Sequence, residues 1–335
     1  MRFFLICALL LTLIKGPMPA LAKQKGQIPI RMLILPKFEI GAMTGDAAGE
    51  AQLLYETYLA GGDEYEIRGG YDGHKLYVRD GIAMYVTGMG KVNAAVSMMA
   101  VLQDKRFDFS DAYVLALGCA GGAEGVAVLG DVCVVTSVVD YDMGYHTDLQ
   151  ETEGGEEATW YPDPELSKAA VVRLNPELTD RVYGLVKDVP VYGHEAVRAY
   201  MKESFSDAAW ATRAPKVLKG TAVTSDSYWK GGFNHRQAVR KAEAYGCAEP
   251  FTVSEMEDVA IARTLERMGM LDRLIILRDC VNMDVFPKGM TPEKMWGSGK
   301  AENPEMEMKY IDEILFPMAR QSSFNVACAI IEGLL

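Results

Sequence analysis

The sequence lacks a long apolar run beyond its first residues. A helix that crosses a bilayer needs about 18 to 20 consecutive apolar residues. The best later candidate, AYVLALGCAGGAEGVAVLGDVCVVTSVV at 112–139, is interrupted by glycines, Glu124 and Asp131. We therefore expect the mature chain not to span a membrane and not to form a channel by itself.

Histidine and cysteine are also scarce. The 335 residues include four histidines and six cysteines, without a C-x-x-C pair or the spacing of a zinc site. Cys7 lies in the N-terminal apolar run, which leaves five scattered cysteines that cannot all pair. The sequence predicts no metal site and mostly buried thiols, and it leaves one disulfide open in an oxidising compartment.

Basic residues are outnumbered by acidic ones, with 34 Lys and Arg against 46 Asp and Glu and a formal net charge of -12. Residues 1–22 contain Arg2 and Lys15 and no acid, so their removal takes -12 to -14. An acidic surface of this kind disfavours nucleic acids and anionic membranes as main partners.

The first residues, MRFFLICALLLTLIKGPMPALA, follow the pattern of a secretory signal peptide. Arg2 precedes an apolar run from Phe3 to Ile14, helix-breaking residues follow, and Ala20-Leu21-Ala22 matches an A-x-A cleavage site. We expect residues 1–22 to be cleaved, residues 23–335 to form a single domain, and the protein to be exported to the periplasm. An uncleaved anchor is the alternative.

Apolar strand-like runs alternate with helical patterns along the rest of the chain. This alternation predicts an α/β fold with a central mixed sheet flanked by helices. The segment 140–219 is polar and less periodic, and we interpret it as an elaboration of the sheet. Two helices are expected at the C-terminus, at 304–319 and 322–335. The predicted strands are 30–36, 81–90, 112–122, 130–142 and 274–284, with a helix over 91–104 and another from about 257. The strand at 112–122 is expected to run into a glycine-rich turn at 118–122.

Two glycine-rich stretches are candidate ligand-binding segments. GMGKVNAA at 88–95 lacks the third glycine and the acidic residue of a dinucleotide fingerprint, so a nicotinamide enzyme is disfavoured. Its N–H groups face a polar ligand, or the loop is simply a tight turn. GCAGG at 118–122 contains Cys119, but no histidine motif supplies the base that a cysteine nucleophile needs. Close backbone approach to a ligand fits these glycines better.

Two further motifs have both a structural and a functional interpretation. TSDSYWKGG at 224–232 presents Tyr228 and Trp229, which either stack on a flat ring or belong to the core. Ser254-x-x-Glu257 matches a capping box, in which the Glu257 carboxylate turns back to the helix N-terminus. The pattern alone favours the cap over a substrate-binding role.

In their order along the chain, GMGKVNAA, GCAGG, TSDSYWKGG, SEMED and LRDCVNMD resemble the nucleoside phosphorylase superfamily. Nearly all of the mature chain resembles the bacterial branch of the purine nucleoside permease family, through KFEIGAMTGDAAGEAQ, LNPELTDRVYGL, SEMEDVA and KGMTPEKMW as well. The resemblance implies the fold of soluble enzymes that cleave N-glycosidic bonds, and the family name implies a part in nucleoside uptake.

The resemblance also implies roles for single residues. Met256 and Glu257 would bind ribose, Tyr228 would stack on the base, and the backbone of Trp229 would read the purine edge. A turn at Gly118–Gly122, with Cys119, Ala120 and Gly121, would lie along the nucleoside. Gly90 and Asn93 would lie near the sugar or a phosphate.

Asn282 stands where related nucleosidases have the aspartate that protonates purine N7. An amide donates a hydrogen bond but cannot act as a general acid. Asp284, two residues on, would lie too far along the strand to replace it. GEAQLL resembles the segment of related nucleosidases whose glutamate activates water, which makes Glu50 the candidate for that role. Lys37 is the only base between Pro36 and Thr57, and the acids there repel phosphate and suit the activation of water.

We therefore expect an exported purine nucleoside-binding protein that cleaves the N-glycosidic bond, by hydrolysis in preference to phosphorolysis. The alternative is a non-catalytic nucleoside-binding component of uptake that works with a membrane transporter. No cofactor is expected, although phosphate remains a candidate co-substrate. By analogy with the superfamily, the chain is expected to form a homo-oligomer.

Overall fold

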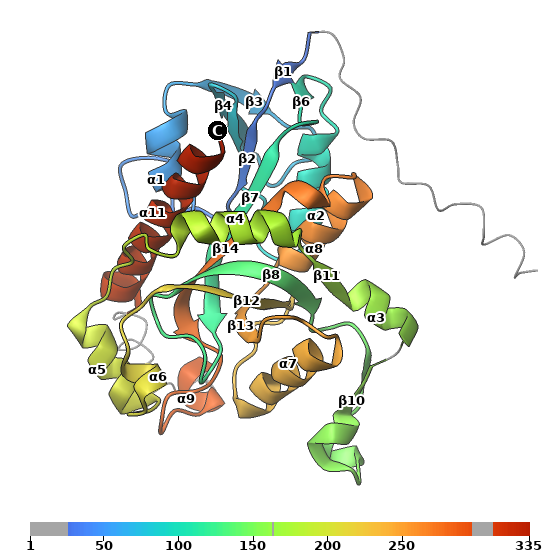
Figure 1. Ribbon diagram of the computed structural model, residues 1–335, viewed down its shortest axis with the longest axis vertical. Coiled ribbons are helices and arrows are strands. Elements are labelled where there is room, and N and C mark those ends of the chain that lie inside the picture. Colours follow the sequence, from blue (N-terminus) through green and yellow to red (C-terminus); the bar gives the residue numbers. More distant parts are fainter. Residues whose placement is uncertain (1–25, 163, 297–310) are drawn as a thin grey trace, which may run out of the picture.

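A ten-stranded mixed sheet organises the protein in this computed structural model, which describes residues 26–162, 164–296 and 311–335 (Figure 1). The strand order is β11-β8-β12-β13-β7-β2-β5-β4-β3, and β14 pairs with both β7 and β8. The predicted signal peptide lies outside the described residues. The strands of this sheet are β2 (Met32–Leu35), β3 (Asp63–Glu66), β4 (Lys75–Arg79), β5 (Ile82–Met84), β7 (Tyr113–Gly122), β8 (Val132–Asp140), β11 (Val171–Arg173), β12 (Val217–Thr224), β13 (Phe251–Glu255) and β14 (Leu274–Met283).

The central strands are apolar on both faces because helices cover both sides. Strand β2 is buried at every position, and β7, β8 and β14 are buried along almost their whole length. Strands β2, β5, β7 and β14 are parallel neighbours, whereas β13 pairs with β7, and β8 with β14, in the antiparallel sense. The expectation of an α/β fold with a central mixed sheet is therefore confirmed.

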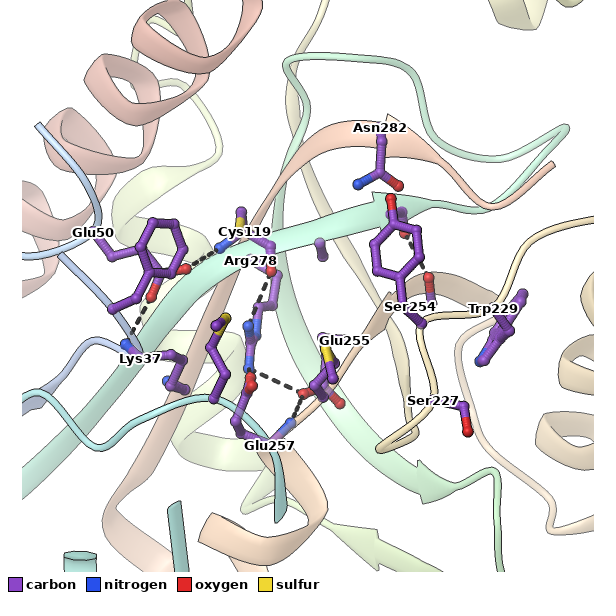
Figure 2. Close-up of a pocket in the computed structure, with 16 residues that line it drawn as sticks. Lys37, Glu50, Cys119, Ser227, Trp229, Ser254, Glu255, Glu257, Arg278 and Asn282 are labelled. Carbon is purple, nitrogen blue, oxygen red and sulfur yellow. Dashed lines mark hydrogen bonds and ion pairs between the residues drawn. The ribbon is translucent and has the colours of Figure 1, made fainter. Parts of the chain in front are cut away.

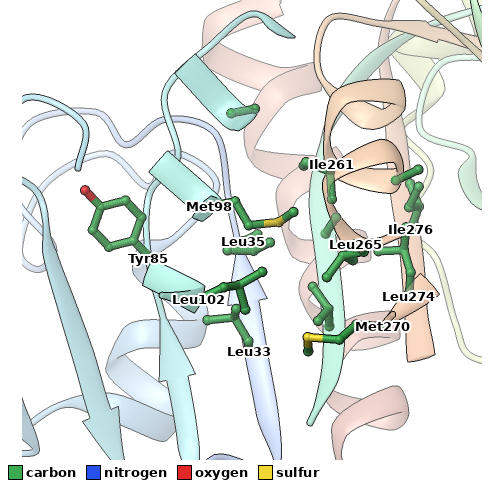
Figure 3. Close-up of a cluster of buried hydrophobic side chains, with 14 of the residues drawn as sticks. Leu33, Leu35, Tyr85, Met98, Leu102, Ile261, Leu265, Met270, Leu274 and Ile276 are labelled. Atoms are coloured by element: carbon green, nitrogen blue, oxygen red, sulfur yellow. The ribbon is translucent and has the colours of Figure 1, made fainter. Parts of the chain in front are cut away.

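Helices α2 (Lys91–Leu102) and α8 (Asp258–Arg267) pack on one face of the sheet (Figure 3). Met98 and Leu102 of α2 meet Leu33 and Leu35 of β2, and Leu265 of α8 lies in the same buried cluster. Helices α1 (Gln52–Leu54), α4 (Pro176–Val186) and α11 (Phe316–Leu334) supply the cluster on the other face. These two layers hold the strand ends in fixed positions.

The segment 140–219 is an elaboration of the sheet, as the sequence predicted. It contains β11 at the edge, a small hairpin of β9 and β10, and helices that lie beside the sheet. Figure 1 shows the hairpin projecting from the main body. The hairpin consists of β9 (Tyr145–His146) and β10 (Trp160–Tyr161). Besides β11 and α4, the segment 140–219 also contains helices α3 (Pro164–Ala170), α5 (Glu195–Ser204) and α6 (Ala209–Thr212). The remaining elements are β1 (Ile28–Pro29), β6 (Phe107–Asp108), α7 (Gly232–Ala244) and α9 (Pro292–Trp296), with short helical turns at Tyr55–Leu59, Leu149–Glu151, Gly155–Thr159, Leu271–Arg273 and Ile311–Leu315.

Two boundaries differ from the sequence prediction. The stretch 118–122 is not a turn, because β7 continues through Gly122 and pairs there with β13 and β14. The C-terminal helix α11 runs unbroken through 319–322, where two separate helices were expected. The expected helix start at Pro304 lies outside the described residues.

One helix in the described part of the chain, Glu313–Leu334, is long and apolar enough to cross a membrane by length and composition. Half of its most apolar window is buried inside the fold, and it packs against β14 and α4. The sequence did not single it out because Arg320 and the polar residues within 321–325 interrupt its apolar residues. Its buried face is that of a core helix.

Candidate functional site

A cavity of about 100 Å³ lies where the ends of β2, β7, β12, β13 and β14 converge. Figure 2 shows Glu50 at one end of it and Asn282 at the other, with Glu257 and Arg278 between them. Polar and charged side chains alternate here with aromatic and thioether groups. The lining residues are Lys37, Phe38, Glu50, Met89, Cys119, Ala120, Gly121, Ser227, Tyr228, Trp229, Ser254, Glu255, Met256, Glu257, Arg278 and Asn282.

The Glu50 carboxylate is fixed by backbone donors from two strands. Its Oε2 accepts the N–H of Lys37 at 2.7 Å, just after β2, and its Oε1 accepts the N–H of Cys119 at 2.8 Å in β7. Glu50 is 5% exposed. A buried carboxylate held in this way has one orientation toward the cavity, as a group that handles a proton requires.

Arg278 of β14 gathers three carboxylates at the floor of the cavity. Its guanidinium contacts Glu255 Oε2 and Glu257 Oε2 at 3.0 Å each and Asp258 Oδ1 at 2.6 Å. Burial acts to lower the pKa of Arg278, but the three acids outweigh it and raise that pKa. Burial, together with repulsion from Asp258, raises the pKa of Glu255 to about 8. Arg278 thus holds three acidic side chains together with a single positive charge.

The predicted capping box is wrong, and the contacts of Glu255 and Glu257 show which of the two acids binds the start of the helix. Strand β13 extends to Glu255, so Ser254 lies in a strand and its hydroxyl donates to Gly121 O at 3.4 Å. The carboxylate of Glu255 accepts the N–H groups of Glu257 and Asp258 at 2.6 and 2.7 Å. Glu255 therefore satisfies the start of α8, and Glu257 is left to line the cavity.

The second Glu257 oxygen, Oε1, accepts the N–H of Gly90 at 2.9 Å. The next N–H, that of Lys91 at the start of α2, donates to Asp226 Oδ1 at 2.7 Å. The Lys91 ammonium contacts Asp140 and Asp142 at 3.0 and 2.8 Å. The protein's own carboxylates thus occupy the helix N-terminus that could receive an anionic ligand.

The other end of the cavity carries the flat and amide-bearing side chains. Tyr228 is 55% exposed at the rim, and Trp229 stacks on Tyr141 with ring centroids 5.1 Å apart. Asn282 lines the cavity, whereas Asp284 does not. Asp284 is buried and contacts His235 Nδ1 at 2.6 Å through Oδ2, so it is not turned to the position that Asn282 occupies.

Most of the predicted site residues meet at this cavity, but three do not line it in the expected way. Gly90 approaches through its N–H, which Glu257 occupies. Gly118 lies beneath the cavity, where an added Cβ would come within 2.7 Å of Arg278 and 2.8 Å of Glu50. Asn93 is outside the lining, since its amide donates to Met89 O at 2.8 Å on the exposed side of α2.

The described cysteines, Cys119, Cys133, Cys247, Cys280 and Cys328, are free thiols. Burial, with the nearby Glu50, raises the pKa of Cys119 to about 12. Because the thiolate is the nucleophilic form, this cavity-lining thiol is unsuited to attack. No group of three or more histidine, cysteine, aspartate or glutamate side chains suited to a metal ion occurs within 26–162, 164–296 and 311–335.

Two basic side chains near Glu50 have surroundings that the sequence did not predict. Lys37 is buried, and its ammonium donates to Leu35 O at 2.7 Å and Leu117 O at 3.1 Å. Arg320 of α11 pairs with Asp279 and lies 4.0 Å from Glu50 Oε1. The basic character of Lys37 was visible in the sequence but its burial was not, and nothing local signals that α11 brings Arg320 to this point.

Solved structures of similar fold include nucleosidases. A 5′-methylthioadenosine/S-adenosylhomocysteine nucleosidase from Neisseria meningitidis, in complex with methylthio-immucillin-A, superposes with a TM-score of 0.55 at 18% identity, over 90% of this chain and 98% of the other. The corresponding nucleosidase from Colwellia psychrerythraea, in complex with adenine, gives 0.54 at 18% identity, over 92% and 97%. At this identity the likeness establishes the nucleoside phosphorylase-type fold.

Relatives of known name are more similar in sequence over a shorter span. A probable purine nucleoside permease of Schizosaccharomyces pombe is 26% identical over 61% of this chain and 64% of its own length. A purine nucleoside permease of Candida albicans is 25% identical over 63% of this chain and 56% of its own length. The matches thus span less than two-thirds of these relatives. The family model for purine nucleoside permease (NUP) matches residues 29–334, and the chain therefore belongs to the purine nucleoside permease family.

Proposed function

We propose that the protein binds purine nucleosides in this cavity and cleaves their N-glycosidic bond with water. The observation that carries the proposal is the arrangement of Glu50 and Glu257 with Asn282 around one cavity. Glu257 would accept the ribose hydroxyls, Tyr228 would cover the base, and Met256 would pack against the sugar.

In the proposed reaction, the bond from C1′ to the purine nitrogen breaks and a bond from C1′ to water oxygen forms. Glu50 takes the proton of the attacking water. The departing purine accepts a hydrogen bond at N7 from Asn282 and receives its proton from solvent, because an amide has none to transfer. Such a reaction passes through an oxocarbenium-like state, which an acidic cavity stabilises.

Water is favoured over phosphate by the electrostatics of the site. Lys37 donates to two backbone carbonyls, Arg278 contacts three carboxylates, and Arg320 pairs with Asp279. The N–H groups at the start of α2 contact Glu257 and Asp226. A phosphate dianion would have to displace these partners beside the lining carboxylates of Glu50 and Glu257.

A second candidate function is nucleoside binding without turnover, as part of uptake through a membrane partner. Asn282 favours it, because the residue at N7 supplies no proton. The family name is compatible with this interpretation.

We also propose export after removal of residues 1–22.

We also propose that two copies of the protein associate through helix α2. The apolar side chains of Met89, just before α2, and of Val92 and Val96 on α2 are 54%, 70% and 56% exposed. Met89 also lines the nucleoside cavity, so a second copy seated on this part of α2 would lie next to the cavity.

The test is product analysis with the purified mature protein and inosine, guanosine or adenosine. Free base with ribose in phosphate-free buffer is the expected result. Base with ribose 1-phosphate, formed only when phosphate is added, would replace hydrolysis by phosphorolysis. Calorimetric nucleoside binding without any product would favour the uptake role.

A further inference from the structure

The loop 225–231, here called the base loop, carries Ser227, Tyr228 and Trp229 into the cavity lining. Its beginning is tied to Asp142, which accepts the Ser225 hydroxyl at 2.7 Å and the Asp226 N–H at 3.0 Å. Its end is tied to Asp284 through the N–H of Gly231, which donates to the Asp284 carbonyl at 2.8 Å. These contacts hold the two ends of the loop that carries Tyr228.

The second anchor, Asp284, also has a carboxylate with two partners. Its Oδ1 accepts the N–H of Glu124, after β7, at 3.0 Å, and its Oδ2 contacts His235 Nδ1 at 2.6 Å. His235 lies in the first turn of α7, and its own N–H donates to Gly231 O at 3.0 Å. One buried carboxylate thus joins the end of β14, the end of β7 and the helix that follows the base loop.

The charge of His235 depends on pH in the physiological range. Its side chain is 15% exposed and faces Asp284 and Glu124, with Arg236 on its own helix and the Phe251 ring of β13 beside it. Burial lowers the pKa of His235, but the hydrogen bond and charge of Asp284, aided by Glu124, outweigh burial and Arg236. The net pKa lies above the ordinary value of 6.5.

We propose that His235 and Asp284 form a pH-dependent clasp on the base loop, which tightens nucleoside binding when His235 is protonated. The binding part rests on the proposed nucleoside site. Because the folded state holds the proton more tightly than the unfolded chain, the extra stability is complete below pH 6.5. It is lost as the pH rises through the folded value.

The clasp itself is tested without any ligand, by hydrogen exchange of residues 225–231 between pH 5.5 and 8.5, with labelling times scaled for the intrinsic change in amide exchange. In the wild type, protection of the loop should fall as the pH rises. In His235→Asn it should stay at the high-pH level throughout. Asp284→Asn, which keeps an acceptor for the Glu124 N–H, is the second variant and should behave alike.

His194→Asn is the matched control, because His194 also stands at a helix start, that of α5, but its Nδ1 accepts the N–H of Ala196 at 3.2 Å and contacts no carboxylate of the base loop. It should retain the wild-type pH dependence. Equal pH dependence of loop protection in the wild type and in folded His235→Asn would overturn the clasp.

Nucleoside affinity gives the functional readout, measured by calorimetry in a Glu50→Gln background that suppresses turnover. From pH 5.5 to 8.5, affinity should weaken about three- to tenfold more in Glu50→Gln than in the Glu50→Gln/His235→Asn double variant. Glu255, whose pKa is raised to about 8, titrates in both proteins, so its effect cancels in this comparison. A loop that responds to pH in a protein that binds no nucleoside would refute the proposed site and retain the clasp. An affinity that varies equally with pH in the single and in the double variant would refute the role of the clasp in nucleoside binding.

Discussion

At the scale of single residues, the Glu255 carboxylate binds the N–H groups at the start of α8, whereas the Glu257 carboxylate is the one proposed to bind ribose. Glu257→Gln keeps the shape of the side chain but removes its charge. We predict that nucleoside affinity falls about 10- to 100-fold, since hydrogen bonds to charged groups contribute about 1.5–3 kcal/mol. Calorimetry measures the change. Glu266→Gln, an exposed glutamate on the same helix, is the control, and equal affinities of Glu257→Gln and wild type would contradict the ribose assignment.

Gly118 is predicted to be essential for a reason other than ligand approach. A Cβ there would come within 2.8 Å of the Glu50 carboxylate and 2.7 Å of the Arg278 guanidinium, both of which are buried. Gly118→Ala should displace Glu50 and reduce base release about 100-fold or more, within the range that general base catalysis contributes. The rate of base release is the measurement. In Gly184→Ala the new Cβ meets open space, and loss of rate there as well would contradict the steric account.

The residues that the sequence identified and those that it missed differ in a physical respect. Tyr228, Glu257 and Asn282 occur in local motifs, so their place in the cavity followed from the resemblance. Arg320 reaches Glu50 only through packing of α11 against β14, which no local pattern encodes. The exchange of roles between Glu255 and Glu257 depended on where β13 ends, and a shift of one or two residues decides it.

At the scale of elements, helix α8 follows directly on Glu257 and begins with Asp258, so it must be held against the sheet to keep these carboxylates in place. Leu265 is fully buried between α8 and the sheet (Figure 3). Leu265→Ala should lower the free energy of unfolding by about 2–5 kcal/mol, as measured by chemical denaturation. Leu149→Ala removes the same atoms from a side chain that is 43% exposed. A similar loss in both variants would show that α8 packing is not the cause.

The alternation of strands and helices predicted the architecture because it reflects burial, which acts along each element. It could not predict that β7 continues through three glycines. There, pairing with β13 and β14 fixes the extended backbone, and the glycines leave room for Glu50, Ser254 and Asn282 beside the strand. Tertiary contact, not local preference, sets that boundary.

At the scale of the whole molecule, the exposed apolar side chains of α2 predict self-association. Val92→Glu places a charge in the proposed contact and should convert the assembly to monomers in light scattering, because a buried unpaired charge is unfavourable. Leu149→Glu, a change at another exposed apolar position, should leave the mass unchanged. A wild type that is already monomeric would contradict this prediction.

The most direct test of the central claim compares base release by the wild type and Glu50→Gln in phosphate-free buffer. Both proteins should bind the nucleoside, and only the wild type should release base at an appreciable rate, with a difference of about 100- to 10,000-fold in kcat. Glu56→Gln, on an exposed neighbouring glutamate, should match the wild type. Nucleoside binding by all three proteins with no release by the wild type, or equal release by wild type and Glu50→Gln, would contradict the account.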